Sequence, residues 1–86
     1  MPYGIMEMIG QYIGNRIILA NMNDNTIRLY TVGGVLVYEW SNIKIVDRPM
    51  GVAINDDGIL FVTHYTSKDI CFFDIDDSKV QFMGKL

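Results

Sequence analysis

Short apolar blocks separated by polar breaks run along the whole chain. They occupy residues 4–9, 16–22, 26–32, 35–40, 51–55, 59–65, 69–75 and 80–84. β-branched and aromatic residues are concentrated in these blocks, and no 3.6-residue period persists for a dozen residues. The pattern predicts an all-β protein in which each block is one strand.

The breaks between the blocks have the chemistry of turns. They fall at Gly14-Asn15, Asn23-Asp24-Asn25, Gly33-Gly34, Asp57-Gly58, Ser67-Lys68 and Asp76-Asp77-Ser78. Glycine and asparagine accept a positive φ, and Asx and serine side chains bond their own backbone. Such breaks between short apolar blocks predict antiparallel hairpins.

The chain contains an internal repeat. Residues 16–32 match residues 59–75 at a spacing of 43, and residues 2–5 match residues 49–52 at a spacing of 47. The difference of four predicts a longer turn at residues 10–15 in the first copy. A period in the forties is typical of propeller blades. We therefore divide the chain into blade 1 with its interblade connection (1–48) and blade 2 (49–86), each a four-stranded antiparallel sheet.

The strands are apolar on both faces. The stretches RIILA, ILFV and ICFF do not alternate apolar and polar residues, so both sides of each sheet require cover. Two stacked sheets cover one pair of faces and leave two apolar faces open, more than a soluble monomer normally exposes. Either the chain is part of a longer one, or several copies assemble.

Residues 48–75, RPMGVAINDDGILFVTHYTSKDICFFDI, resemble the NHL-type repeat: Pro-x-Gly-Val-Ala, then Asp-Gly, then a strand, a polar loop and a strand ending in an aromatic residue and Asp. The stretch LFVTHYTSKDICFFD is also similar to the YVTN-type propeller repeat. The resemblance implies two propeller blades. Because propellers of this family usually have six blades, it favours a homotrimer that closes a six-bladed ring.

Composition narrows the classes of function. Half of the 86 residues are hydrophobic, the net charge is −3, and the seven Lys and Arg residues are scattered. A nucleic-acid binder needs a concentrated basic stripe, so we expect no nucleic-acid partner. We also expect no membrane partner, because no apolar run reaches the roughly 20 residues of a membrane helix. Without a recognisable signal sequence, a cytoplasmic location is expected.

The interblade connection and the loops between second and third strands are expected on one face of the propeller, where ligands of this family usually bind. The candidate residues are Asn21, Asn23, Asp24, Asn25, Asp47, Arg48, His64, Tyr65, Lys68 and Asp69. They predict a recognition face for a protein, peptide or glycan. The alternative is turn chemistry alone, because Asn, Asp and Ser occupy turns for backbone reasons.

Candidate catalytic and metal-binding residues are few. His64 has no nucleophile or carboxylate fixed beside it by a local motif, and Cys71 lies in an apolar block where a buried, inert thiol is expected. Glu7 is a metal candidate only through the resemblance to gluconolactonase-like propellers, in which a channel carboxylate lies on an innermost strand. No cofactor is expected.

These observations favour a non-enzymatic propeller module that assembles with itself into a ring and offers a recognition face. One alternative is a metal-assisted hydrolase of the lactonase or esterase type working in the ring channel. Another is a propeller fragment, or an engineered or ancestral-like form, without activity of its own.

Overall fold

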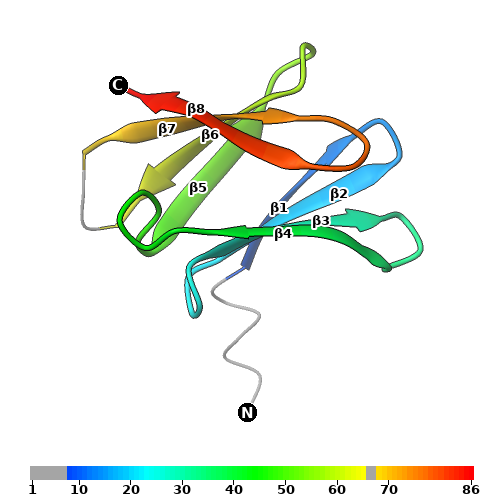
Figure 1. The fold of residues 1–86 in the computed structure, drawn as a ribbon, viewed down its shortest axis with the longest axis horizontal. Helices are drawn as coiled ribbons and strands as arrows, with labels where there is room; N and C mark the ends of the chain where they lie inside the picture. The colour runs from blue at the N-terminus through cyan, green and yellow to red at the C-terminus, as the bar shows by residue number, and fades with distance from the viewer. Residues whose placement is uncertain (1–7, 66–67) are drawn as a thin grey trace.

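The structure is a computed structural model that describes residues 8–65 and 68–86, and this part of the chain contains strands and turns but no helix (Figure 1). The strands are β1 (Met8–Ile13), β2 (Arg16–Asn21), β3 (Thr26–Thr31), β4 (Leu36–Ser41), β5 (Pro49–Ile54), β6 (Ile59–His64), β7 (Ile70–Ile75) and β8 (Val80–Lys85). The all-β prediction is confirmed.

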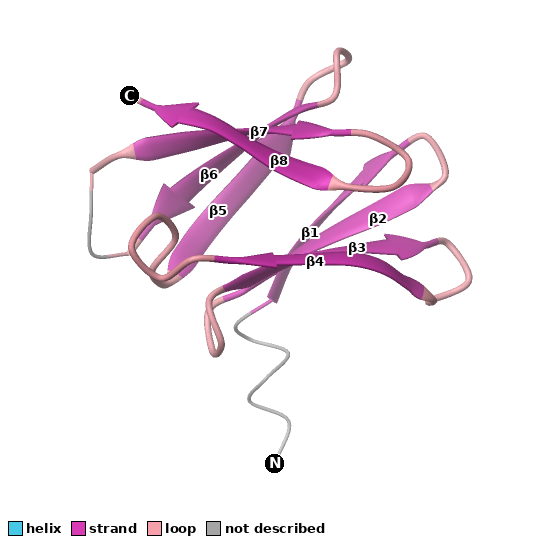
Figure 2. Ribbon diagram, viewed as in Figure 1, coloured by secondary structure: helices cyan, strands magenta, loops and turns pink. Residues whose placement is uncertain are grey.

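The strands form two antiparallel sheets in simple meander order, β1-β2-β3-β4 and β5-β6-β7-β8. The sheets are stacked, and no described strand of one is hydrogen-bonded into the other (Figure 2). Equivalent strands lie near each other across the stack, β1 beside β5 and β4 beside β8. The second sheet begins at Pro49, where the sequence repeat places the start of the second copy.

The first strand differs from its prediction. The apolar block at residues 4–9 was expected to form it, but β1 covers Met8–Ile13, and residues 4–7 lie outside the described part of the chain. Ile13 pairs with Arg16 across a two-residue turn in which Gly14 has a φ of 56°. Glycine at the first central position suits a tight hairpin whose twist matches its strands. The expected longer turn at 10–15 is therefore absent.

The outer hairpin of each sheet has a register irregularity, and these two are equivalent; the second sheet has another between β5 and β6, at Pro49 to Gly51. The register of β3 and β4 shifts between Leu29 and Tyr30, and that of β7 and β8 shifts between Phe72 and Phe73. These positions are related by the spacing of 43 found in the sequence. The two copies therefore share strand order and also the place at which the outer hairpin is bulged, which increases local twist.

The core lies between the sheets. The first sheet contributes the fully buried side chains of Ile18, Ala20, Ile27 and Leu29, and the second contributes those of Leu60, Val62, Cys71 and Phe73. Trp40 from β4 reaches across to the second sheet, with its ring centroid 4.8 Å from that of Phe73 in an edge-on arrangement. The Phe82 ring contacts both of these rings, with its centroid 6.2 Å from that of Trp40 and 5.5 Å from that of Phe73.

The two sheets meet through opposite faces. We call the side of the first sheet that faces the core its front face. The front face of the second sheet is the side formed by the residues 43 positions later. The front face consists of Ile18, Ala20, Ile27 and Leu29, and, 43 residues on, of Phe61, Thr63, Ile70 and Phe72. The back face consists of Leu60, Val62, Cys71 and Phe73, and, 43 residues earlier, of Ile17, Leu19, Arg28 and Tyr30.

The front of the first sheet thus packs on the back of the second. The front of the second sheet and the back of the first face outward, and their side chains are half-buried or exposed instead of fully buried. On the outward front face, Phe61 and Phe72 pack edge-on against each other with centroids 5.3 Å apart. Each sheet is therefore covered on one face by this chain alone.

Replacing Phe73 by Ala tests the core. The side chain is fully buried and contacts two aromatic rings, so its removal leaves a cavity and is expected to cost about 3–5 kcal/mol. Urea unfolding followed by tryptophan fluorescence measures this, because Trp40 lies against the site. Val35→Ala is the control, since Val35 is 65% exposed in a turn, and should change stability by less than about 0.5 kcal/mol. Equal losses in the two variants would contradict the assigned core.

Candidate functional site

Three loops meet at one end of the stacked sheets. They are the β2–β3 loop, the β4–β5 connection and the β6–β7 loop, and Arg48 joins them. The Arg48 backbone N–H donates to Oδ1 of Asn25 at 2.6 Å, and the Tyr65 backbone N–H donates to the Arg48 carbonyl at 2.9 Å. The Arg48 guanidinium lies 5.8 Å from the centroid of the Tyr65 ring, within the range of a cation–π contact. We call Asn25, Arg48 and Tyr65 the loop cluster.

The backbone of the loop cluster is left-handed at two positions. Asn25 has a φ of 59° and Arg48 a φ of 52°. Asparagine adopts this region readily, whereas a long side chain such as arginine does so at a cost. Hydrogen bonds on both sides of Arg48 hold its peptide groups in place, and the Asn25 N–H donates to the Asn21 carbonyl at 2.8 Å. The cluster is therefore a defined structure instead of a set of independent turns.

Other predicted residues of this face contact their own loop or the end of a neighbouring strand. Asn21 is buried and its Oδ1 accepts from the Asn23 N–H at 2.8 Å. Asp47 lies 4.0 Å from the Arg48 side chain. The Asp69 carboxylate lies 3.5 Å from Nζ of Lys85, and the Lys68 side chain is exposed. Turn chemistry accounts for the Asn21 and Asn23 contact, whereas Asn25, Arg48 and Tyr65 link different loops.

Asp24 belongs to an ion-pair network on the back face of the first sheet, which the sequence did not predict. Arg28 donates to Oδ2 of Asp24 at 2.7 Å and, through Nε, to Oε1 of Glu39 at 2.9 Å. Partial burial raises the pKa of Asp24, but hydrogen bonds from Thr26 and Arg28 and the charge of Arg28 outweigh it, and the pKa lies below its ordinary value. The hydrogen bonds to Glu39 and Asp24, with the charges of both carboxylates, raise the pKa of Arg28 above its ordinary value.

His64 and Cys71 lie together in the seam between the sheets. His64 Nδ1 is 3.1 Å from the Asp69 carbonyl, and its Nε2 is 3.8 Å from the Cys71 sulfur. The Cys71 thiol also lies 3.6 Å from the Ile45 carbonyl. Since β6 and β7 pair Val62 with Cys71, His64 is the diagonal neighbour of Cys71 on the same face. The hairpin register was the signal in the sequence that places them together.

This pair is not arranged as a nucleophile and its base. The Asp69 carbonyl can only accept, so Nδ1 of His64 donates to it, and the Cys71 thiol donates to the Ile45 carbonyl. Cys71 is fully buried, and burial raises the pKa of its thiol above the ordinary value. A reactive cysteine needs an accessible thiolate. The pair is a buried contact in which the thiol keeps its proton.

Metal-binding groups are not gathered in the part of the chain that the structure describes. Within residues 8–65 and 68–86, no three His, Cys, Asp or Glu side chains are placed to hold an ion together. Glu7, the candidate for an axial carboxylate, lies outside the described residues. Among the described residues, there is also no helix long and apolar enough to cross a membrane.

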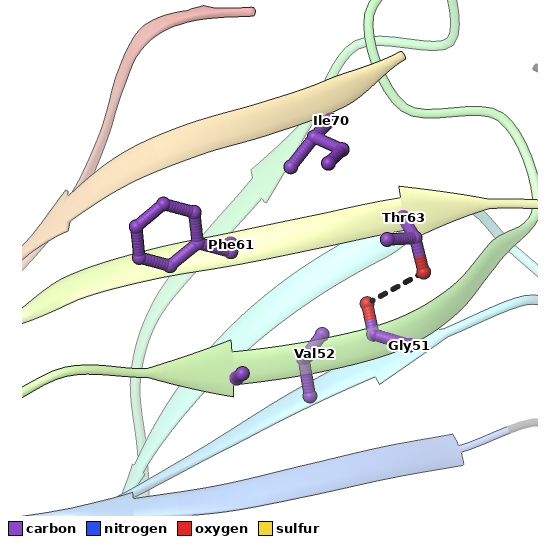
Figure 3. Close-up of a pocket in the computed structure, with 6 residues that line it drawn as sticks. Gly51, Val52, Phe61, Thr63 and Ile70 are labelled. Carbon is purple, nitrogen blue, oxygen red and sulfur yellow. Dashed lines mark hydrogen bonds between the residues drawn. The ribbon is translucent and has the colours of Figure 1, made fainter. Parts of the chain in front are cut away.

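The outward front face of the second sheet contains a hollow of about 320 Å³. Its lining residues are Gly51, Val52, Ala53, Phe61, Thr63 and Ile70, from β5, β6 and the start of β7 (Figure 3). Thr63 donates its hydroxyl proton to the Gly51 carbonyl at 3.4 Å, so that polar group has a partner within the sheet. A methyl group on Gly51 would come within 2.8 Å of the Thr63 hydroxyl, so glycine allows the close approach of β5 and β6 here.

Comparisons with protein-family models, with curated proteins and with solved structures found no match to this chain.

Thiol labelling tests the state of Cys71. We expect the native protein to react with a thiol reagent at pH 8 at least about a hundredfold more slowly than the urea-unfolded chain, because the thiol is buried and protonated. The unfolded chain is the matched control, since this cysteine is the only one in the sequence. Equal rates in the two states would show that the seam between the sheets is open.

Substitutions at Asn25 test the loop cluster. Asn25→Ala removes the acceptor of the Arg48 N–H and places a residue with a Cβ at a φ of 59°. It is expected to destabilise the protein by about 1–2 kcal/mol, the range for a lost hydrogen bond with backbone strain. Asn25→Gly keeps the backbone free and should cost less, which separates the two effects. If thermal unfolding of both variants matches that of the unchanged protein, Asn25 does not organise the loops.

Proposed function

We propose that this chain is a non-enzymatic module of two β-propeller blades that assembles with copies of itself into a closed ring. The observation that carries the proposal is the packing of opposite faces. Each chain has an unused front face on its second sheet and an unused back face on its first sheet. These are the same two kinds of face that already pack together inside the chain.

A head-to-tail contact between copies follows from this pairing. The front of the second sheet in one copy would pack on the back of the first sheet in the next copy. Within the chain, the front of the first sheet already packs on the back of the second in the same way. Such a contact uses two different patches and therefore repeats around a ring if its rotation closes. Equivalent strands lying together, β1 beside β5 and β4 beside β8, are the arrangement expected of successive blades.

We infer a trimer from the blade number. Three copies of two sheets supply six blades, the usual number in the NHL-type family that residues 48–75 resemble. In such a ring the loop cluster would occur on one face in every copy. Asn25, Arg48 and Tyr65, with the polar residues around them, would then form the recognition face for a protein, peptide or glycan.

The absence of enzymatic activity is part of the proposal. The thiol of Cys71, beside His64, is buried and protonated and therefore provides no accessible nucleophile. The charged groups of Arg28, Asp24 and Glu39 engage one another in ion pairs. This favours binding over catalysis.

Mass measurement in solution tests the assembly. Light scattering coupled to size exclusion should give about three times the chain mass of 9.8 kDa. Because folding and assembly are linked, the melting temperature should also rise with protein concentration. A fourfold mass would retain the ring with eight blades. A protein that remains monomeric at every concentration, with a constant melting temperature, would refute the proposal.

A further inference from the structure

The hollow on the outward front face has the shape and chemistry of a receptor for apolar side chains. Its lining is aliphatic and aromatic apart from the Thr63 hydroxyl, which is bonded to Gly51 within the sheet. Figure 3 shows the Phe61 ring and the Ile70 side chain at its border. No charged side chain lines it. An occupant therefore gains by burying apolar surface and has no unpaired polar group to satisfy.

The chain contains its own template for the occupant. Phe61, Thr63 and Ile70 are equivalent to Ile18, Ala20 and Ile27, which are fully buried in the core against the second sheet. In that core the opposing back face supplies Leu60 and Val62. By the same spacing of 43, the equivalents of Leu60 and Val62 are Ile17 and Leu19, both half-buried on the outward back face.

The aromatic cluster of the core has a second counterpart. The bulges of the two outer hairpins lie at equivalent positions, so β4 and β8 can be aligned residue by residue. Trp40 lies opposite Ile27, and its equivalent is Leu86, which is bonded to Ile70. The equivalent of Phe82 is Leu36. Phe73 corresponds to Tyr30. The group Trp40, Phe73 and Phe82 is thus matched by Leu86, Tyr30 and Leu36, which lie on the two outward faces of one chain. Leu36 is 48% exposed and Leu86 76%, so both side chains are available for a contact.

We propose that the hollow binds Ile17 and Leu19 of a second copy of this chain, and that Leu86 of the first copy packs against Tyr30 and Leu36 of the second. This inference rests on the proposed self-assembly and specifies its interface residue by residue. The contact is directional, because the two patches differ and neither is complementary to itself.

The charged group on the incoming face is compatible with this contact. Arg28 occupies the position equivalent to the buried Cys71, so it would be desolvated when the faces meet. Its guanidinium already donates to Asp24 and Glu39 on the same face, at 2.7 and 2.9 Å. A charge that brings two hydrogen-bonded partners with it avoids much of the cost of burying an unpaired ion.

Two blocked variants and their mixture test the direction of the contact. Leu19→Asp places a charge on the outward back face, and Phe61→Asp places one in the hollow. Each variant alone is expected to be monomeric, because every contact in a ring needs both faces. An equimolar mixture should form a one-to-one dimer of about 20 kDa, through the intact hollow of the first and the intact back face of the second.

Ile43→Asp is the matched control, since it adds the same charge at a side chain that is 64% exposed in the connection between the sheets, outside both patches, and it should assemble like the unchanged protein. If the unchanged protein is monomeric, the proposed function itself fails. If it assembles but the mixture of blocked variants stays monomeric, or either blocked variant assembles alone, the self-assembly stands and this interface is wrong.

Cross-linking decides the case in which a blocked variant fails to fold. Leu36→Cys and Leu86→Cys change exposed side chains and leave both sheets intact. Under mild oxidation the mixture of the two should give a disulfide-linked dimer on a non-reducing gel, at least tenfold more than either variant alone. The buried Cys71 should take no part. Dimers that form equally in one variant alone would show a same-face contact and overturn the inference.

Discussion

The packing of unlike faces of two equivalent sheets is the constraint on which the rest of this structure depends. Ile18 and Leu29 of one sheet are buried against Leu60 and Phe73 of the other, and the equivalents of all four lie on the outside. Two sheets related by a twofold axis would pack through the same face of each, and the two faces left outside would also be identical. Two sheets stacked in the same sense always leave one face of each kind, so the stack has a direction.

The connection between the sheets maintains that direction. Val46 is fully buried in the core, and Arg48 bonds to Asn25 before it and Tyr65 after it. Pro49 then begins β5, its ring fixing φ at the start of the strand. The loop cluster is consequently the point where the orientation of the second sheet on the first is held. Any ligand that engages Arg48 and Tyr65 would contact both sheets' loops at once.

Much of this fold could be predicted from the sequence, and the exceptions have physical reasons. Seven of the eight blocks became strands close to the predicted positions, because turn residues such as Gly33-Gly34 and Asp57-Gly58 delimit them. The first described strand begins later than predicted, at Met8, because the two-residue turn at Gly14-Asn15 sets the register of the hairpin and the apolar run before it does not. Contacts of His64 with Cys71 follow from hairpin register. The meeting of Asn25 with Arg48 required the packing of the sheets, which local patterns do not encode.

The paired bulges have a further consequence for solubility. β4 and β8 are edge strands, and an edge with free backbone groups can recruit strands from other molecules. A bulge at the same place in each outer hairpin interrupts the regular ladder there, and Glu39 and Lys85 put a charged side chain on each edge strand. Such features discourage lateral growth into open, fibre-like sheets. Uncontrolled aggregation through strand edges is thereby hindered while the broad faces of the sheets stay available.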